Sequence, residues 1–176
     1  MPDIRQRVEE EQGILKKIQM FVPGFRGYRR RDDLRDADRM LRDQLAVKLG
    51  DLRRQVEDSR ALVVNTYRSK ELELMGGLIN EYKKLEGLVK HSTPGWSGIS
   101  ADIQFKEDKI FNLYDYDASM IEALGGMQKG IDQLRCDLTA QDSAAAQRTT
   151  LQLKSQLTGF EQQFKRRIDV IQGTEA

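Results

Sequence analysis

The run LYDYD holds the residues of this chain that come nearest to a catalytic set. Two carboxylates can divide acid and base roles when they face one another. Asp115 and Asp117, however, are two residues apart, which puts them on different sides of a helix. We therefore interpret them as part of a solvated face beside Tyr114 and Tyr116. In an enzyme, this run would have to meet the arginines of residues 29–31 in a pocket between helices.

The single cysteine and the single histidine are poorly placed for nucleophilic catalysis. Cys136 lies between Leu134 and Leu138, which predicts a small, semi-buried thiol, and His91 lies in a distant loop. One cysteine and one histidine provide no spacing typical of a metal site, and no glycine-rich loop carries the Lys-Ser/Thr pair of a P-loop. The sequence thus predicts no catalytic residue, no metal site and no cofactor.

Residues 21–31, FVPGFRGYRRR, place aromatic side chains among arginines. Arginine donates forked hydrogen bonds to phosphate and carboxylate, and aromatic rings stack or insert, which would suit a membrane, a nucleic acid or a protein. In the structural alternative, which we favour, the aromatics close the end of a helical hairpin and the arginines neutralise Asp32, Asp33 and Asp36. The candidate interaction residues are Phe21, Phe25, Arg26, Tyr28, Arg29, Arg30, Arg31 and Trp96.

Trp96, the only tryptophan, stands in the segment PGWSG. It is either a plug over the end of a helical bundle or an exposed anchor for a partner, and we favour the plug. Because deleting a buried aromatic side chain costs about 3–5 kcal/mol, Trp96→Ala should lower the thermal unfolding temperature markedly, and native emission should be blue-shifted. Red-shifted emission with little change in stability would place Trp96 in solvent.

The turn FVPGFRGY, the charged helix after it, the PGWSG loop and the LYDYD helix resemble an uncharacterised family of small bacterial helical proteins. In that family a Pro-Gly-Phe-x-Gly-Tyr turn precedes a charged helix, and a Gly-aromatic-Ser-Gly loop follows later. The resemblance covers most of residues 15–121. This chain has Trp96 in place of tyrosine, and Ile99 and Ser100 in place of Leu-Phe. The resemblance implies no activity or site residues and favours treating both loops as fold-defining.

Composition favours long helices over a thick globular core. Charged residues make up 32% of the 176 residues and hydrophobic residues 39%, which is more surface and less core than usual. We expect a single domain over residues 1–176, because this length is ordinary for one domain. The formal charge of +1 makes nucleic acid an unfavoured partner, since such binders normally carry a basic excess.

Nothing in the sequence predicts export or membrane insertion. No apolar run reaches the length of about 18 residues that a spanning helix needs. The N-terminal MPDIRQRVEEEQ has acidic residues where a signal peptide has an apolar core. A single cysteine forms no intramolecular disulfide, which fits a reducing compartment. We expect a cytoplasmic protein.

Apolar residues recur every three or four positions, the helical period, along most of the chain. The predicted helices span residues 3–20, 30–60, 72–89, 106–138 and a last segment after Asp142, its expected N-cap. In the second helix, Asp38 and Arg42 fall between apolar positions and are assigned to an exposed, charged face. Residues 61–70 either form a turn or continue the helix, and residues 92–105 form a loop or hinge.

These patterns predict an all-α protein: elongated antiparallel helical hairpins, or a bundle of long helices. If a turn ends the second helix, the FVPGFRGY turn and the PGWSG loop lie at the same end. Such apolar stripes suit helix–helix contact within or between chains, as in coiled coils. We expect a non-enzymatic scaffold or adaptor that binds a protein partner or itself, with no small-molecule substrate. The alternative is a peripheral binder of anionic membrane or nucleic-acid surfaces through residues 21–31.

Overall fold

A computed structural model describes residues 4–28, 31–66, 69–92 and 107–173. Over these residues it contains the helices α1 (Ile4–Phe21), α2 (Arg31–Val63), α3 (Ser69–His91), α4 (Glu107–Thr139) and α5 (Ser143–Gln172). The all-α prediction is confirmed, and each helix lies close to its predicted range. Residues 93–105 of the predicted hinge, Trp96 among them, fall outside the described residues.

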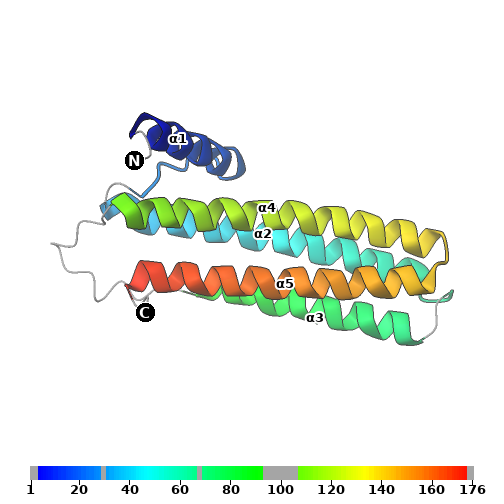
Figure 1. The fold of residues 1–176 in the computed structure, drawn as a ribbon. Helices are drawn as coiled ribbons and strands as arrows, with labels where there is room; N and C mark the ends of the chain where they lie inside the picture. Colours follow the sequence, from blue (N-terminus) through cyan, green and yellow to red (C-terminus); the bar gives the residue numbers. More distant parts are fainter. Residues whose placement is uncertain (1–3, 29–30, 67–68, 93–106, 174–176) are drawn as a thin grey trace.

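Helices α2 to α5 form an up-down-up-down four-helix bundle (Figure 1). α2 packs against α3 and α4, and α5 packs against α4 and α3, so the ring of helices is closed. Of the two alternatives for residues 61–70, the turn is observed: α2 ends at Val63, and the Thr66 N–H donates to the Val63 carbonyl at 3.0 Å. The start of α2 and the end of α3 therefore meet at one end, where Arg42 Nη1 donates to the Lys90 carbonyl at 3.3 Å.

The predicted apolar stripes form the core of the bundle. In α2, for example, the stripe residues Leu41, Leu45, Leu49, Leu52 and Val56 are all 0% exposed. Each fully buried aliphatic side chain contributes about 1.5–3 kcal/mol relative to an exposed one. The packing of these stripes therefore holds the long helices together.

The ends of α5 show why this helix starts and stops where it does. The Asp142 side chain accepts a hydrogen bond from the Ala145 N–H at 2.9 Å, so the predicted N-cap is confirmed. At the other end Gly173 adopts φ 69°, a left-handed conformation that glycine enters without strain. Its N–H donates to the Val170 carbonyl, which satisfies a terminal acceptor.

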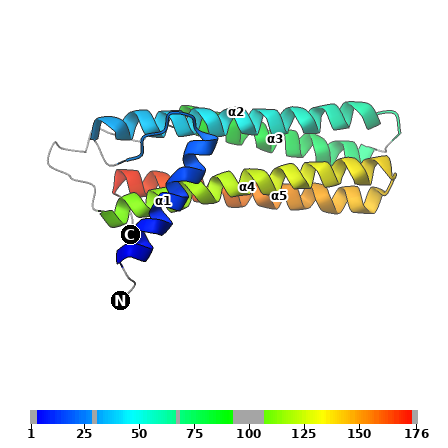
Figure 2. The ribbon, with the colours of Figure 1, turned by 90° about the horizontal axis from the view of Figure 1, so that it is seen from above.

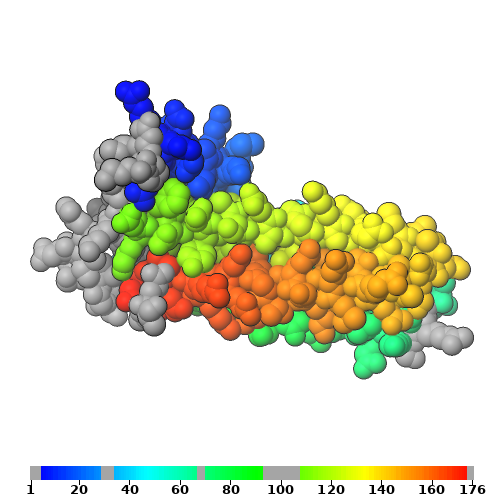
Figure 3. Space-filling model, viewed as in Figure 1, coloured from blue at the N-terminus to red at the C-terminus, as the bar shows by residue number. Residues whose placement is uncertain are grey.

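Helix α1 lies outside the ring and crosses α4 near the end where α2 begins (Figures 1 and 2). Its second half packs inward: Ile18 is buried, and Ile14 and Leu15 pack against the core. Val8, in contrast, is 43% exposed. The apolar stripe of this helix therefore reaches the core only in its second half, and the side chains of residues 5–10 are exposed at the surface of the molecule (Figure 3).

Two glycines of α4 differ in how closely α5 approaches them. A Cβ atom at Gly130 would lie 2.7 Å from Leu153 Cδ2, whereas a Cβ atom at Gly125 would meet nothing within 4 Å. Both Gly→Ala changes gain up to about 1 kcal/mol of helix propensity, but only Gly130→Ala overpacks the α4–α5 contact. Urea unfolding should therefore find Gly125→Ala more stable than Gly130→Ala by about 1–3 kcal/mol. Equal stabilities would mean that the helices do not approach closely there.

Candidate functional site

A cluster of charged and phenolic side chains lies inside the bundle, near the end that α1 crosses. No member is more than 7% exposed, and Arg167 and both aspartates are 0% exposed. We call this set the buried cluster: Tyr28, Asp38, Arg42, Tyr114, Asp117 and Arg167. Tyr28 comes from the turn after α1, and the others come from α2, α4 and α5.

The guanidinium of Arg167 is the centre of the buried cluster. Its Nη1 atom contacts Asp38 Oδ1 and its Nε atom contacts Asp117 Oδ1, each at 2.5 Å, while Nη2 donates to the Tyr28 hydroxyl at 2.9 Å. That hydroxyl donates to Asp117 Oδ2, and Arg42 Nε donates to Asp38 Oδ2 at 2.9 Å. All four carboxylate oxygens thus accept a hydrogen bond, and two guanidinium groups balance two carboxylates. Such pairing is what makes buried charge tolerable.

Burial and charge act in opposite directions on the ionisable groups of the buried cluster. Burial opposes the charge of Arg167, but the negative charges around it, Asp117 first, hold the pKa of its guanidinium well above the ordinary value. Burial raises the pKa of Asp117, and the nearby charge of Arg167 with its hydrogen bonds moderates that rise. Burial also raises the pKa of the Tyr28 phenol well above the ordinary value. Tyr28 is therefore a neutral donor at physiological pH.

The turn of residues 22–28 inserts Tyr28 into the bundle. Gly24 and Gly27 have φ of 83° and 89°, angles that side-chain-bearing residues rarely adopt. The Tyr28 ring stacks on Tyr114 with centroids 5.3 Å apart, and the Tyr28 N–H donates to the Tyr114 hydroxyl at 3.2 Å. Phe25 packs edge-on against Tyr28, also at 5.3 Å. The turn thus belongs to the core of the protein.

The structure separates the candidate interaction residues into buried aromatics and an exposed arginine. Phe25 and Tyr28 are 2% and 1% exposed, Phe21 is half-buried, and Arg26 is exposed. Arg29, Arg30 and Trp96 lie outside the described residues, as does the side chain of Arg31. Tyr28 packs against Tyr114 of α4 and accepts a hydrogen bond from Arg167 of α5, so this aromatic residue lies in the core and not on a binding surface.

Three assignments from the sequence were wrong. Asp117, assigned to a solvated face, is 0% exposed, and Asp38 and Arg42, assigned to an exposed face, are 0% and 7% exposed. The two aspartates are buried because Arg167 reaches them from another helix and satisfies their charge, and Arg42 is buried because it pairs with Asp38. Cys136, predicted semi-buried, is exposed, because the helix turns its position away from the neighbouring leucines. Asp115 is exposed and does not join the buried cluster.

Arg167 was missed by the sequence reasoning, although a signal for it exists. It lies three residues after Phe164 and four before Ile171, at a position where the apolar stripe of α5 continues. Asp117 likewise follows Leu113 by four residues on the stripe of α4. Opposite charges at core positions of different helices predict a buried ion pair, because an unpaired charge there would be too costly.

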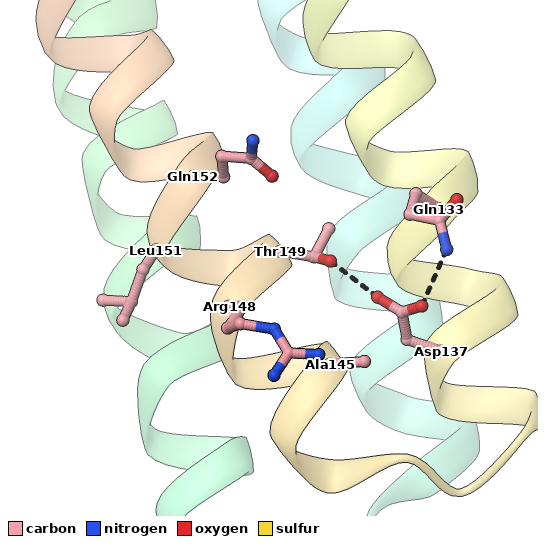
Figure 4. Close-up of a pocket in the computed structure, with 7 residues that line it drawn as sticks. All are labelled: Gln133, Asp137, Ala145, Arg148, Thr149, Leu151 and Gln152. Carbon is pink, nitrogen blue, oxygen red and sulfur yellow. Dashed lines mark hydrogen bonds between the residues drawn. The ribbon is translucent and has the colours of Figure 1, made fainter.

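A second polar feature lies at the opposite end of the bundle, in an open hollow between α4 and α5 (Figure 4). There Asp137, 7% exposed, accepts hydrogen bonds from Gln133 at 2.8 Å and from Thr149 at 2.6 Å, one on each carboxylate oxygen. The other residues that line the hollow are Ala145, Arg148, Leu151 and Gln152. Because both oxygens of Asp137 are already engaged, the hollow resembles a helix–helix contact more than a reaction site.

The buried cluster joins the turn to three helices and is closed to solvent. A reacting group needs access to a substrate and a site about 3 Å away where the substrate atom can sit, whereas here each polar group is occupied by another. Within the part of the chain that the structure describes, no group of three or more His, Cys, Asp or Glu side chains could hold a metal ion. The arrangement is thus suited to positioning the 22–28 turn.

The two buried tyrosines Tyr28 and Tyr82 lead us to predict how the stability of the protein depends on pH. Burial raises the pKa of Tyr28 and of Tyr82 above the ordinary value near 10, so both keep their protons in the folded protein when the unfolded chain has lost them. The unfolded state then binds fewer protons, and the free energy of unfolding falls as pH rises above about 10. Urea unfolding between pH 8 and 11 should show this fall, and Tyr82→Phe should make it shallower. If Tyr82→Phe left the dependence of the unfolding free energy on pH unchanged, the raised pKa of Tyr82 would be contradicted.

Fold and site together define an up-down four-helix bundle with an accessory helix tied in by a buried ion-pair cluster. Comparison of the chain with models of known families, with curated proteins and with solved structures gave no match. The resemblance to a bacterial helical family therefore stays an expectation. Among the described residues, no helix has the length and apolar character needed to cross a membrane.

Proposed function

We propose that this protein is a non-enzymatic helical scaffold or adaptor that binds a protein partner or a second copy of itself. The observation that carries this proposal is the first half of α1. From Arg5 to Glu10 every residue is exposed, and Val8 keeps 43% of its surface open. At 1.5 Å per residue such a stretch presents roughly 9 Å of helix on which a partner can pack.

The thermodynamics of short helices supports the same proposal. A helix that buries apolar side chains through only one half has little to stabilise its exposed half, since isolated helices shorter than about 12–15 residues are marginal in water. A partner helix that covered Val8 would supply the missing contact. The exposed charges of Glu9 and Glu10 would then select the partner, because charges beside an apolar seam set pairing specificity.

The alternative, an anionic membrane or nucleic acid bound through residues 21–31, has less support. It relied on aromatics that insert or stack beside arginines, but Phe25 and Tyr28 are buried in the core. Arg26 is exposed, so it can still make a purely electrostatic contact with an anionic surface. Co-sedimentation with anionic vesicles, repeated after replacing Arg26, Arg29, Arg30 and Arg31 with Gln, tests that contact. Arginine-dependent pelleting would favour this alternative over the adaptor.

The adaptor proposal can be tested by site-specific photo-crosslinking in cells that make the protein naturally. A photoreactive amino acid replaces Val8 in the full chain, and the control replaces Leu151, which is 54% exposed on α5. We expect a discrete protein adduct from position 8 and none from position 151. Light scattering of the purified protein distinguishes self-association from a different partner. A monomer that gives no adduct at either position, or equal adducts at both, contradicts the proposal.

A further inference from the structure

The four-helix bundle is closed without the segment before it. Each of α2 to α5 packs against two of the others, and the core stripes of these helices face one another. Residues 4–28, which we call the arm, comprise helix α1, which crosses the outside of this ring over α4 (Figure 2), and the turn that carries Tyr28 into the bundle. The ring of helices is therefore complete without the arm, and the buried side chains of the arm, Ile18, Val22, Phe25 and Tyr28, join the hydrophobic core of the ring.

The arm is held by weak ion pairs at the surface and by the buried contacts of residues 14–28. At the surface, Arg7 pairs with Asp108 at 3.2 Å and Lys17 with Glu122 at 3.3 Å, and all four side chains are more than half exposed. Such pairs contribute about 0–1 kcal/mol each. The buried contacts are those of residues 14–28, and Tyr28 makes the hydrogen bonds to charged groups of the bundle.

We infer that the arm opens as a unit while the four-helix bundle stays folded, and that Tyr28 is the residue that holds it closed. When Tyr28 leaves, Arg167 keeps its contacts with Asp38 and Asp117, and water replaces the phenol at Arg167 Nη2 and Asp117 Oδ2. The bundle thus loses one neutral group and no charge partner. Opening uncovers Tyr114, on which Tyr28 stacks, so the conformational change exposes a new apolar surface. This inference does not depend on the proposed function.

Tyr28→Phe tests the inference because it removes only the hydroxyl. In the closed form the substitution leaves Arg167 Nη2 and Asp117 Oδ2 without the hydroxyl as a hydrogen-bond partner. In the open form water already makes hydrogen bonds with both atoms, so the substitution costs nothing there. The opening equilibrium should therefore shift roughly ten- to hundred-fold towards the open form. The matched control is Tyr82→Phe: Tyr82 is also 0% exposed, but its hydroxyl has no hydrogen-bond partner among the residues that the structure describes. This control should leave the arm unchanged.

Native-state hydrogen exchange read by mass spectrometry measures the opening. In the wild type, amides of residues 14–28 should exchange faster than the core amides of α2 to α5. Tyr28→Phe should speed the arm amides roughly ten-fold or more and leave the core amides unchanged. The inference is overturned if the wild-type arm exchanges as slowly as the core, if Tyr28→Phe accelerates the arm and the core by the same factor, or if it accelerates neither. The wild-type comparison decides even if the variant fails to fold.

Discussion

Arg167→Met is expected to lower the free energy of unfolding by about 3–5 kcal/mol, measured by urea denaturation at pH 7. The methionine fills much of the same space, so a cavity is not the main cause. The loss comes from Asp38 and Asp117, which are both 0% exposed and each lose the contact at 2.5 Å that made their burial tolerable. Since small domains are stable by only about 5–15 kcal/mol, this one substitution removes a large share.

The neighbouring arginine provides the control. Arg166 precedes Arg167 in the same helix but is exposed, so Arg166→Met should change stability by no more than about 0.5 kcal/mol. A combined variant with Tyr28→Phe, Asp38→Leu, Arg42→Met, Asp117→Leu and Arg167→Met should recover most of the loss. Replacing a whole buried ion-pair network by apolar residues is often neutral or stabilising. A combined variant less stable than Arg167→Met alone would contradict this account.

The helices could be predicted because each one carries its own periodic signal. The stripe from Leu34 to Val56 specifies the buried face of α2 whatever lies opposite, and Asp142 caps α5 through a local hydrogen bond. The turn after Val63 was harder, since Leu62 and Val64 suit a helix and a strand alike. Packing resolved that ambiguity: α3 can cover the apolar stripe of α2 only if the chain reverses.

The buried cluster could not be predicted because its stability is a property of several elements together. Asp38 alone in α2 looks like any charged residue among Arg35, Arg39 and Asp43. Its burial is favourable only once Arg167 arrives from α5, 129 residues further along the chain. The insertion of Tyr28 is equally non-local, because it needs the Tyr114 ring beside it. A search for opposite charges on different apolar stripes would have found part of this cluster.

Gly27→Ala is expected to lower the free energy of unfolding by about 2–5 kcal/mol. The alanine would have to adopt φ 89°, a left-handed angle that costs about 1–2 kcal/mol. Its Cβ would also lie 2.3 Å from the Tyr114 hydroxyl. The clash pushes Tyr114 away from the Tyr28 N–H and from the stacked ring, which adds roughly 1–3 kcal/mol of overpacking. Urea unfolding of the full chain gives the total.

Gly24→Ala separates the two contributions. Gly24 has nearly the same backbone angle, φ 83°, but a Cβ there would lie 3.4 Å from Met40 Cε, an ordinary contact with the end of a flexible side chain. It should therefore show only the backbone cost of about 1–2 kcal/mol. Equal losses of stability in the two variants would mean that Tyr114 moves aside at no cost and does not support the turn.

The loss of stability in Gly27→Ala also has an upper limit. Once the strain exceeds the free energy that holds the arm against the bundle, the arm opens and the strain is relieved. Hydrogen exchange of residues 14–28 in this variant should then approach that of an open arm, while the core of α2 to α5 stays protected.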